Sequence, residues 1–459
     1  CGIVGIISNQ SEIQEKYRDD IQDSLQLLKH RGPDDNGIFS DERLIFGHVR
    51  LSILDLSDAG SQPMTSSEDN LAITYNGEVY NFKDIRGSLK SVEKFKSNTD
   101  TEVILKFYNS LGVESFEKLN GMFAFAIFDK IKQKVFLVRD RFGIKPLYYK
   151  VNSSEIIFSS EIKAIKRLDP AKDVIDIDGL SEWTYYGNAL REKTLYKNIR
   201  KVLPGTYLEI DLENLEIAEK TFWSPEKIKQ IHKPDPQSVI KKTKQLIEEA
   251  VKKQLVSDVE VGIFLSGGID SSTITAFASR HYQDKLNTYS VGFDYEDGIS
   301  ELPKAREVAE LFGTNHHEIL IDSYDLVDTI EHLIDCHDLP FSDAANIPLF
   351  LLSKKLGGKI KVILQGDGGD EIFGGYRRYS TLSRIKNIRP FLPLAKKIHS
   401  ILPKTYSFYL RQRYLNAISH SDDSDLMAML LTVEDREKNL FNIYGERISQ
   451  ELKDTNPFS

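Results

Sequence analysis

The sequence predicts an α+β domain over residues 1–210 and a doubly wound α/β domain with a parallel sheet over residues 239–459. Three observations lead to this prediction. Residues 1–210 form short apolar runs that Asn-Gly and Gly-Pro turn signals separate. The polar stretch 224–238 contains three prolines, so we assign residues 211–238 to a linker. Beyond it, apolar strands alternate with helical segments, which is the order of a parallel sheet.

Each element of the first domain is predicted from the spacing of its apolar residues. Continuous or alternating apolar runs predict strands at 3–7, 71–75, 122–128, 135–138 and 147–149. Apolar residues three to four positions apart predict helices near 20–29 and 101–111.

The second domain is expected to open with a helix, because apolar residues recur at helical spacing from Ile240 to Leu255. Apolar runs then predict strands at 259–265, 288–293, 317–321 and 360–364. Parallel strands present their carboxyl ends at one edge of the sheet, where ligands bind. The loops after 265 and after 364 are therefore expected to face each other. Residues beyond 378 have a helical pattern of mixed charge and no site motif.

The composition limits the function classes. A net charge of −9 leaves no basic footprint for nucleic acid or an anionic membrane surface. We find no apolar run of the ~18–20 residues that a membrane-spanning helix needs. The chain has two cysteines. If Cys1 is a nucleophile, Cys336 remains a free thiol, which fits a reducing, cytoplasmic location.

Cys1 is the first candidate catalytic residue. At a mature N-terminus this residue carries a nucleophilic thiol and an α-amine whose ordinary pKa, about 8, lets it act as a base near neutral pH. No partner residue is needed to complete the pair. The alternative is a numbering that merely begins at Cys1, and the residue alone does not decide between the two.

A glycine-rich turn between a strand and a helix predicts a phosphate site at residues 266–272, Ser-Gly-Gly-Ile-Asp-Ser-Ser. Gly267 and Gly268 allow a ligand to approach the backbone, and amides at the helix start favour an anion. Asp270 repels phosphate, so its natural role is to hold Mg²⁺. The turn lacks the Gly-Lys-Ser/Thr ending of a Walker A loop.

A second acidic loop follows the strand at 360–364, with the sequence Gln-Gly-Asp-Gly-Gly-Asp-Glu over residues 365–371. We predict Asp370 as a second Mg²⁺ ligand with Asp270, and Asp367 as a base. The competing interpretation is an ordinary acidic turn, which glycine and aspartate favour in any case.

Several motifs resemble known families. The glutaminase domain of class II glutamine amidotransferases is matched by Cys-Gly-Ile-Val-Gly-Ile from 1, His-Arg-Gly-Pro-Asp from 30, Asn-Gly-Glu from 76, and Asp100. The loop at 266–272 resembles the pyrophosphate loop of the ATP-pyrophosphatase superfamily. Arg-Leu-Ser-Ile from 50, Asp-Arg-Phe-Gly-Ile-Lys-Pro-Leu-Tyr-Tyr from 140 and Glu-Ile-Phe-Gly-Gly-Tyr from 371 extend the likeness. Together they make the chain similar to the glutamine-dependent asparagine synthetases over residues 1–378.

This resemblance implies a fold and a reaction. The first domain is expected to be an N-terminal-nucleophile hydrolase sandwich, with two stacked antiparallel sheets between helices (αββα), and the second an ATP-pyrophosphatase domain. The thiol of Cys1 attacks glutamine and releases ammonia. ATP and aspartate give β-aspartyl-AMP and pyrophosphate, and ammonia that crosses a channel converts the adenylate to asparagine. The family also implies Mg²⁺ and a homodimer.

The resemblance assigns roles residue by residue. The glutamine-binding residues are expected to be Arg50, Leu51, Ile53, Asn76, Gly77, Glu78 and Asp100. Arg50 suits the substrate carboxylate, Asp100 and Glu78 suit its ammonium, and Asn76 with Gly77 suits an oxyanion hole. The ATP-binding residues are expected to be Leu265, Ser266, Gly267, Gly268, Asp270, Ser271, Ser272, Val291, Gln365 and Gly366. Tyr376 is expected near the reaction centre.

The chain also departs from the family pattern. Gln365 replaces the usual serine, and Asp367 replaces a glutamate found in many members. A catalytic lysine and a Glu-Ala-Arg-Val-Pro-like segment are not found after Tyr376, so we expect the second domain to lack its C-terminal part.

Two alternatives to asparagine synthesis remain open. The segment 338–346 lacks the arginine that suits aspartate, so one alternative is an amidotransferase for another carboxylate, such as a uronic acid of a surface polysaccharide. The missing lysine leaves a catalytically decayed binding protein as the other.

Overall fold

The structure is a computed structural model that describes residues 1–403, except 12, 69, 90–93, 172–173, 232, 294–299, 322–325 and 402, and a few positions beyond 403. The chain divides into two compact units. The first unit comprises residues 1–174, 191–340 and 345–365, and the second comprises residues 175–190, 341–344 and 366–459. Most of the helical pattern predicted beyond residue 403 lies outside the described residues.

A first antiparallel sheet contains the N-terminal strand, in the order β10-β8-β9-β1-β3-β2. Its strands are β1 (Gly2–Ser8), β2 (Asp35–Asp41), β3 (Leu44–Arg50), β8 (Tyr148–Val151), β9 (Glu155–Ser159) and β10 (Ile199–Lys201). β1 pairs with both β3 and β9. Cys1 is therefore held at the end of a strand that is hydrogen-bonded on both sides.

A second antiparallel sheet follows the order β12-β11-β7-β6-β5-β4. Its strands are β4 (Met64–Thr65), β5 (Leu71–Val79), β6 (Gly121–Asp129), β7 (Lys134–Arg139), β11 (Thr206–Asp211) and β12 (Ile217–Thr221). The strands predicted at 71–75, 122–128 and 135–138 are confirmed as β5, β6 and β7. β12 lies inside the stretch that we assigned to the linker, so the sheet extends past residue 210. The domain boundaries themselves stay predictions.

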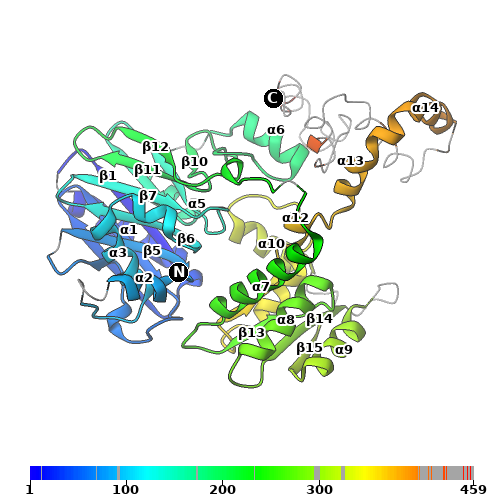
Figure 1. Cartoon of the computed structure of the whole chain (residues 1–459). Coiled ribbons are helices and arrows are strands. Elements are labelled where there is room, and N and C mark those ends of the chain that lie inside the picture. The colour runs from blue at the N-terminus through cyan, green and yellow to red at the C-terminus, as the bar shows by residue number, and fades with distance from the viewer. Residues whose placement is uncertain are drawn as a thin grey trace. The chain divides into compact units, whose positions relative to one another are not determined.

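The two sheets stack face to face and helices cover their outer faces (Figure 1). Ile3, Phe46, Ala124 and Leu137 belong to a buried cluster that both sheets contribute. The first sheet is covered by α1 (Ile13–Leu28) and α5 (Ile162–Leu168), and the second by α2 (Phe82–Leu89), α3 (Asp100–Leu111) and α4 (Glu114–Lys118). This layering confirms the predicted αββα sandwich.

A parallel sheet with the order β15-β14-β13-β16 forms the core of the second predicted domain. Its strands are β13 (Val261–Phe264), β14 (Asn287–Phe293), β15 (Asn315–Ile321) and β16 (Val362–Leu364). All four strands were predicted from the sequence, and their parallel pairing is confirmed. Helix α7 (Pro236–Gln254) precedes these strands, and the helices between them are α8 (Ile269–His281), α9 (Leu302–Phe312), α10 (Leu326–His337) and α11 (Asn346–Leu356).

Helices pack on both faces of the parallel sheet because alternate residues of β13 point in opposite directions. Ile263 packs with α7 and α8, and Leu265 packs with α9. Phe264, between them, joins the cluster that contains Leu352 and Leu356 of α11. This arrangement confirms the doubly wound α/β fold.

The second unit contains α6 (Ile177–Tyr186), α12 (Gly369–Phe373), α13 (Arg377–Ile388) and α14 (Leu392–Ser400). Within the part of the chain that the structure describes, no helix is both long and apolar enough to cross a bilayer.

Candidate active site

Hydrogen bonds to the chain of Arg31 hold the backbone of Cys1. The Cys1 amine donates to the Arg31 carbonyl oxygen (2.8 Å), and Arg31 Nε donates to the Cys1 carbonyl oxygen (3.1 Å). The backbone N–H of Leu51 donates to Cys1 Sγ at 3.4 Å. An N–H donor at the sulfur stabilises a thiolate, so these contacts suit a nucleophile.

The surroundings of the Cys1 amine favour its neutral form. Burial, and then the positive charges of Arg31 and Lys145, lower the pKa of this amine from 8.0 to about 4. The amine is therefore neutral at pH 7 and can accept the proton of the adjacent thiol. Burial also lowers the pKa of Lys145 itself. The sequence motifs included Lys145 and Arg31 but did not assign either to the nucleophile.

A small pocket opens beside Cys1 and gathers most of the predicted glutamine-binding residues. These lining residues are Cys1, Arg50, Leu51, Ile53, Gly77, Glu78 and Asp100. The sequence did not indicate the others, which are Leu54, Gly60, Gln62, Tyr75, Thr99 and Thr101. Cys1 and residues of β3, β5 and the start of α3 thus meet at one site although the sequence separates the lining residues by up to 100 positions, from 1 to 101.

Two carboxylates, those of the buried Asp100 and the half-buried Glu78, line the pocket. Asp100 Oδ2 accepts hydrogen bonds from Tyr75 Oη (2.6 Å) and the Val79 N–H (2.8 Å). Burial, and then the negative charge of Asp100, raises the pKa of Glu78, and burial raises the pKa of Asp100. An ammonium group between Glu78 and Asp100 would lower the pKa of both carboxyl groups, because an opposite charge stabilises each ionised carboxylate. The arrangement suits the α-ammonium of an amino acid.

Arg50 supplies the opposite charge at the pocket. Its side chain is 5% exposed, and its guanidinium donates to the carbonyl oxygens of Ser57 (3.0 Å) and Asp55 (2.5 Å). A side chain at Gly60 would overlap the guanidinium, so a glycine at that position keeps the space for it. These contacts fix the planar fork that pairs well with a carboxylate.

Of the predicted oxyanion-hole pair, Gly77 lines the pocket, whereas Asn76 lies on β5 and is not among the lining residues. Asn76 is 2% exposed, and its Nδ2 donor has no hydrogen-bond partner among the described residues. An unpaired buried donor costs about 1–3 kcal/mol, which a bound oxyanion would offset. At Gly77, a Cβ would overlap the Met122 carbonyl oxygen and lie 2.7 Å from Phe123 Cα. Only glycine therefore fits this position of β5.

The predicted phosphate loop has the geometry of an anion site at the start of a helix. Gly267 has φ +75°, and α8 begins directly after Gly268. Ser266 Oγ and Ser271 Oγ lie 3.0 Å apart and bridge the loop to the first turn of α8. The dipole of this 13-residue helix favours negative charge at its N-terminus, which the loop adjoins.

The predicted adenosine contacts lie at the carboxyl edge of the parallel sheet. The Leu265 N–H donates to the Tyr289 carbonyl oxygen (2.8 Å), and Ser290 Oγ donates to the Leu265 carbonyl oxygen. Val291 follows on β14, and Gln365 follows β16, which pairs with β13. The structure thus brings Leu265, Val291 and Gln365 to one edge.

Gln365 ends a segment of the first unit, and the second acidic loop from Gly366 onward belongs to the second unit. Asp370 lies on α12, and a Cβ at Gly375 would overlap its carboxylate. The Gly375 N–H donates to the Asp370 carbonyl oxygen (2.9 Å), while Tyr376 Oη donates to Glu371 Oε1 (2.8 Å). The roles of Gly366, Asp367 and Asp370, and the expected facing of the two loops, stay predictions.

The described side chains offer few ligands for a magnesium ion. Across the described residues, no group of three or more His, Cys, Asp or Glu side chains is placed to hold a metal ion by itself. Mg²⁺ is commonly held by one or two carboxylates together with substrate phosphates. Asp370 is exposed and has its carboxylate against a glycine, and Asp270 lies in the first turn of α8 beside the phosphate loop. Each carboxylate, taken in its own unit, is a ligand of the type that Mg²⁺ accepts.

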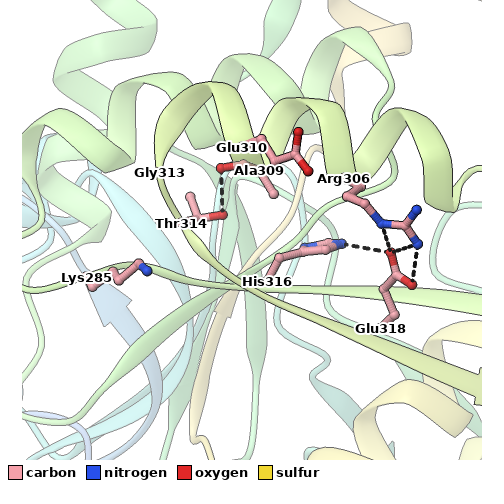
Figure 2. Close-up of a pocket in the computed structure, with 8 residues that line it drawn as sticks. All are labelled: Lys285, Arg306, Ala309, Glu310, Gly313, Thr314, His316 and Glu318. Carbon is pink, nitrogen blue, oxygen red and sulfur yellow. Dashed lines mark hydrogen bonds and ion pairs between the residues drawn. The ribbon is translucent and has the colours of Figure 1, made fainter.

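Another pocket lies at the opposite, amino-terminal end of β14 and β15 (Figure 2). Figure 2 shows Arg306 and His316 directed at the same carboxylate, that of Glu318, and Arg306 Nη2 lies 2.9 Å from it. None of its lining residues was predicted as a site residue. Arg306 and Glu318 neutralise each other in this ion pair, and we assign this pocket no role in the reaction.

Comparisons with known proteins assign families to both regions of the chain. Residues 1–223 match the model of the glutamine amidotransferase domain family, and residues 242–451 match the asparagine synthase family. A Methanocaldococcus jannaschii protein, whose name assigns it provisionally to the glutamine-hydrolysing asparagine synthetases, is 38% identical over 430 residues, or 88% of this chain and 81% of that relative.

A glutamine-hydrolysing asparagine synthetase of Bacillus subtilis is 36% identical over 83% of this chain, which spans 64% of that relative's length. Among solved structures, a glutamine phosphoribosylpyrophosphate amidotransferase from B. subtilis covers 82% of this chain with a TM-score of 0.37 and 15% identity. That likeness is too low to bear on the fold or the function.

Proposed function

Because the chain belongs to the family of glutamine-hydrolysing asparagine synthetases, we propose that it transfers the amide nitrogen of glutamine to the side-chain carboxylate of aspartate. ATP is cleaved to AMP and pyrophosphate in the process. The observation that carries this proposal is the meeting of Cys1, Arg50, Glu78 and Asp100 in one pocket, in a chain that also has a phosphate loop after β13.

The first half-reaction is glutamine hydrolysis at Cys1. Arg50 binds the α-carboxylate of glutamine, and Glu78 with Asp100 binds its α-ammonium, which leaves the side-chain amide beside the sulfur. The neutral Cys1 amine accepts the thiol proton as the sulfur attacks the amide carbon. The same amine then donates a proton to the leaving nitrogen, so that ammonia departs and a thioester remains. Water hydrolyses the thioester to glutamate.

Asn76 and Gly77 stabilise the charge that develops during this attack. As the carbonyl carbon becomes tetrahedral, its oxygen gains negative charge and accepts hydrogen bonds from Asn76 Nδ2 and the Gly77 N–H. Each such donor typically contributes ~10²–10³ to the rate. The absence of another partner for Asn76 Nδ2 among the described residues supports this role.

The second half-reaction activates aspartate. An oxygen of its β-carboxylate attacks the α-phosphorus of ATP, and pyrophosphate leaves. The loop of residues 266–272 binds the pyrophosphate through its backbone amides and serine hydroxyls, while Leu265, Val291, Gln365 and Gly366 surround the adenosine. Ammonia then attacks the β-carbonyl carbon of aspartyl-AMP, giving asparagine and AMP. In this proposal Asp367 acts as the base that removes a proton from the attacking nitrogen.

Asp270 and Asp370 are the residues that would hold Mg²⁺. The ion neutralises phosphate charge when bound. The remaining properties that we propose are a homodimer, a cytoplasmic location, and no nucleic-acid or membrane partner. The family resemblance, the free thiols of Cys1 and Cys336, and the net charge of −9 support these properties.

Pyrophosphate release across a panel of carboxylates tests the proposal. The full-length protein is incubated with ATP, Mg²⁺ and glutamine, plus aspartate, glutamate or a uronic acid. We expect release with aspartate alone, together with an equal amount of asparagine. If pyrophosphate is released only with the uronic acid, the acceptor is the uronic acid and not aspartate. If no carboxylate gives pyrophosphate release above background, the synthetase activity is rejected.

A further inference from the structure

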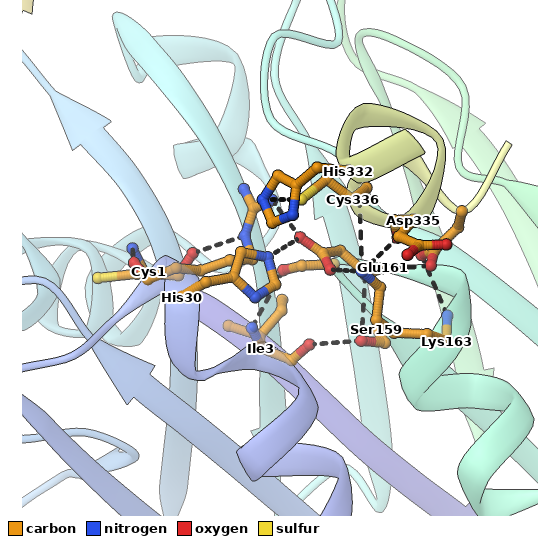
Figure 3. Close-up of polar contacts among 12 residues, drawn as sticks. Cys1, Ile3, His30, Ser159, Glu161, Lys163, His332, Asp335 and Cys336 are labelled. Atoms are coloured by element: carbon orange, nitrogen blue, oxygen red, sulfur yellow. Dashed lines mark hydrogen bonds and ion pairs between the residues drawn. The ribbon is translucent and has the colours of Figure 1, made fainter. Parts of the chain in front are cut away.

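A chain of polar contacts connects Cys1 with the end of α10 (Figure 3). It runs from Cys1 through Arg31 and Glu161 to Lys163, and from there to Asp338. Glu161 and Lys163 lie in the region that matches the amidotransferase domain, whereas Asp338 lies in the region that matches asparagine synthase. Each contact is within the first unit.

Glu161 anchors the residue that holds the backbone of Cys1. Arg31 binds Cys1 through both its carbonyl oxygen and its Nε, and Arg31 Nη1 lies 2.8 Å from Glu161 Oε1. His30 Nε2 lies 2.8 Å from the same oxygen. Burial would raise the pKa of Glu161, but hydrogen bonds from His30 and Arg31 lower it to about 2, so the carboxylate is charged.

The position of Glu161 relative to Cys1 is fixed by the strand that precedes it. Ser159 Oγ donates to the Ile3 carbonyl oxygen (3.0 Å), and the Ile3 N–H donates to Ser160 Oγ (3.0 Å). The Glu161 N–H donates to Ser159 Oγ (3.2 Å). Residues 159–161 are thus hydrogen-bonded to β1 at Ile3, two positions from Cys1. These bonds restrict movement of Glu161 relative to Cys1.

Lys163 connects this anchor to α10. Its Nζ lies 3.2 Å from Glu161 Oε2 and 3.4 Å from Asp338 Oδ1, and it donates to the Asp335 carbonyl oxygen at 3.0 Å. The Lys163 backbone N–H donates to Asp338 Oδ2 (3.1 Å). Asp338 has φ +57°, which non-glycine residues rarely adopt, and such a conformation persists where its surroundings hold it.

We propose that Glu161 is a positioning residue for Cys1. Because Lys163 forms ion pairs with both Glu161 and Asp338, a change at Asp338 alters glutaminase turnover. This inference rests on the proposed function, in which Cys1 is the nucleophile. Asp338 lies in the region that matches asparagine synthase, so the connection ties nitrogen release to the synthetase half of the chain.

The contacts predict an effect on kcat rather than on KM. Arg31 and Glu161 act on the backbone of Cys1, whereas glutamine is recognised by Arg50, Glu78 and Asp100. A shift of the sulfur away from its attack geometry slows the reaction without removing a group that binds substrate. Displacements of about 1 Å can reduce a rate ~10²-fold.

The experiment compares four variants of the full-length protein. Lys163→Met keeps the side-chain length but removes both ion pairs, and Lys163→Arg restores the charge. Asp338→Asn removes one ion pair while asparagine tolerates the positive φ. The matched control is Lys16→Met, because Lys16 pairs with Glu155 at 2.6 Å, and Glu155 is as buried as Glu161, with side chains 7% and 8% exposed.

Glutaminase kcat, KM for glutamine and the unfolding midpoint are measured for each variant. We expect Lys163→Met and Asp338→Asn to lower kcat about fivefold or more with KM within about twofold, while Lys163→Arg and Lys16→Met stay within about twofold of wild type in both constants.

Unchanged kcat in both Lys163→Met and Asp338→Asn would overturn the inference, as would an equal loss in Lys16→Met. If Lys163→Met does not fold, Asp338→Asn decides alone. Failure of the proposed function is recognised separately, because the wild type would then show no glutaminase activity that Cys1→Ala abolishes.

Discussion

Replacing Asn76 with alanine separates the catalytic role of this side chain from its structural role. Asn76 is 2% exposed, and its Nδ2 has no partner among the described residues. If that donor stabilises an oxyanion, its loss should lower glutaminase kcat by ~10²–10³, or about 2.7–4 kcal/mol of transition-state stabilisation. KM for glutamine should change little, because the ground-state amide is bound mainly through the amino-acid head group.

The same substitution should have a small effect on folding. Truncation removes packing contacts, but it also removes an unpaired buried donor that costs about 1–3 kcal/mol. The two effects oppose each other, so the free energy of unfolding should change by less than about 2 kcal/mol. Initial rates of glutamate release and urea unfolding measure the two quantities. A kcat within threefold of wild type, in a variant that folds normally, would refute the oxyanion assignment.

Three further predictions concern the amine, the phosphate loop and the ammonium site. Activity needs the neutral Cys1 amine and is lost as the pH falls through the pKa of that amine, which is lowered to about 4. Glutaminase kcat/KM should therefore fall on the acid side near pH 4. A fall near pH 8 would contradict this prediction. Gly267→Ala adds a Cβ 2.7–2.8 Å from α9 and should abolish pyrophosphate release but spare glutaminase, whereas Gly313→Ala, with φ +65° and open space, should retain both activities. Tyr75→Phe removes the hydroxyl that donates to Asp100, so KM for glutamine should rise about tenfold with kcat nearly unchanged, and an unchanged KM would contradict the ammonium site.

The sequence predicted the sheets well because each strand has its own apolar pattern. The runs at 71–75 and 122–128 lie within β5 and β6, and the alternation of strands and helices after residue 239 correctly indicated parallel pairing. Element ends were less accurate: the helix expected from residue 20 begins at Ile13, and β12 falls within the assigned linker. Its residues 217–221 are mostly exposed, so they lack the apolar pattern that identified the other strands.

For the glutaminase site, the sequence indicated residues that would touch substrate but not those that hold them. Gly60 makes room for the Arg50 guanidinium, and Gln62 Oε1 accepts a hydrogen bond from the Tyr75 N–H (2.8 Å). Both depend on a tertiary approach between separate segments, which no local pattern encodes. Glu161 was missed for the same reason, because its contact with Arg31 joins positions 130 residues apart.

Transfer of labelled nitrogen tests the central claim most directly. The full-length protein is given ATP, aspartate and glutamine labelled with ¹⁵N in its side-chain amide, and asparagine is analysed by mass spectrometry. The account predicts ¹⁵N in the asparagine side chain for the wild type, and for Cys1→Ala no product from glutamine but normal product from added ammonium. Labelled asparagine formed by Cys1→Ala from glutamine would contradict the account.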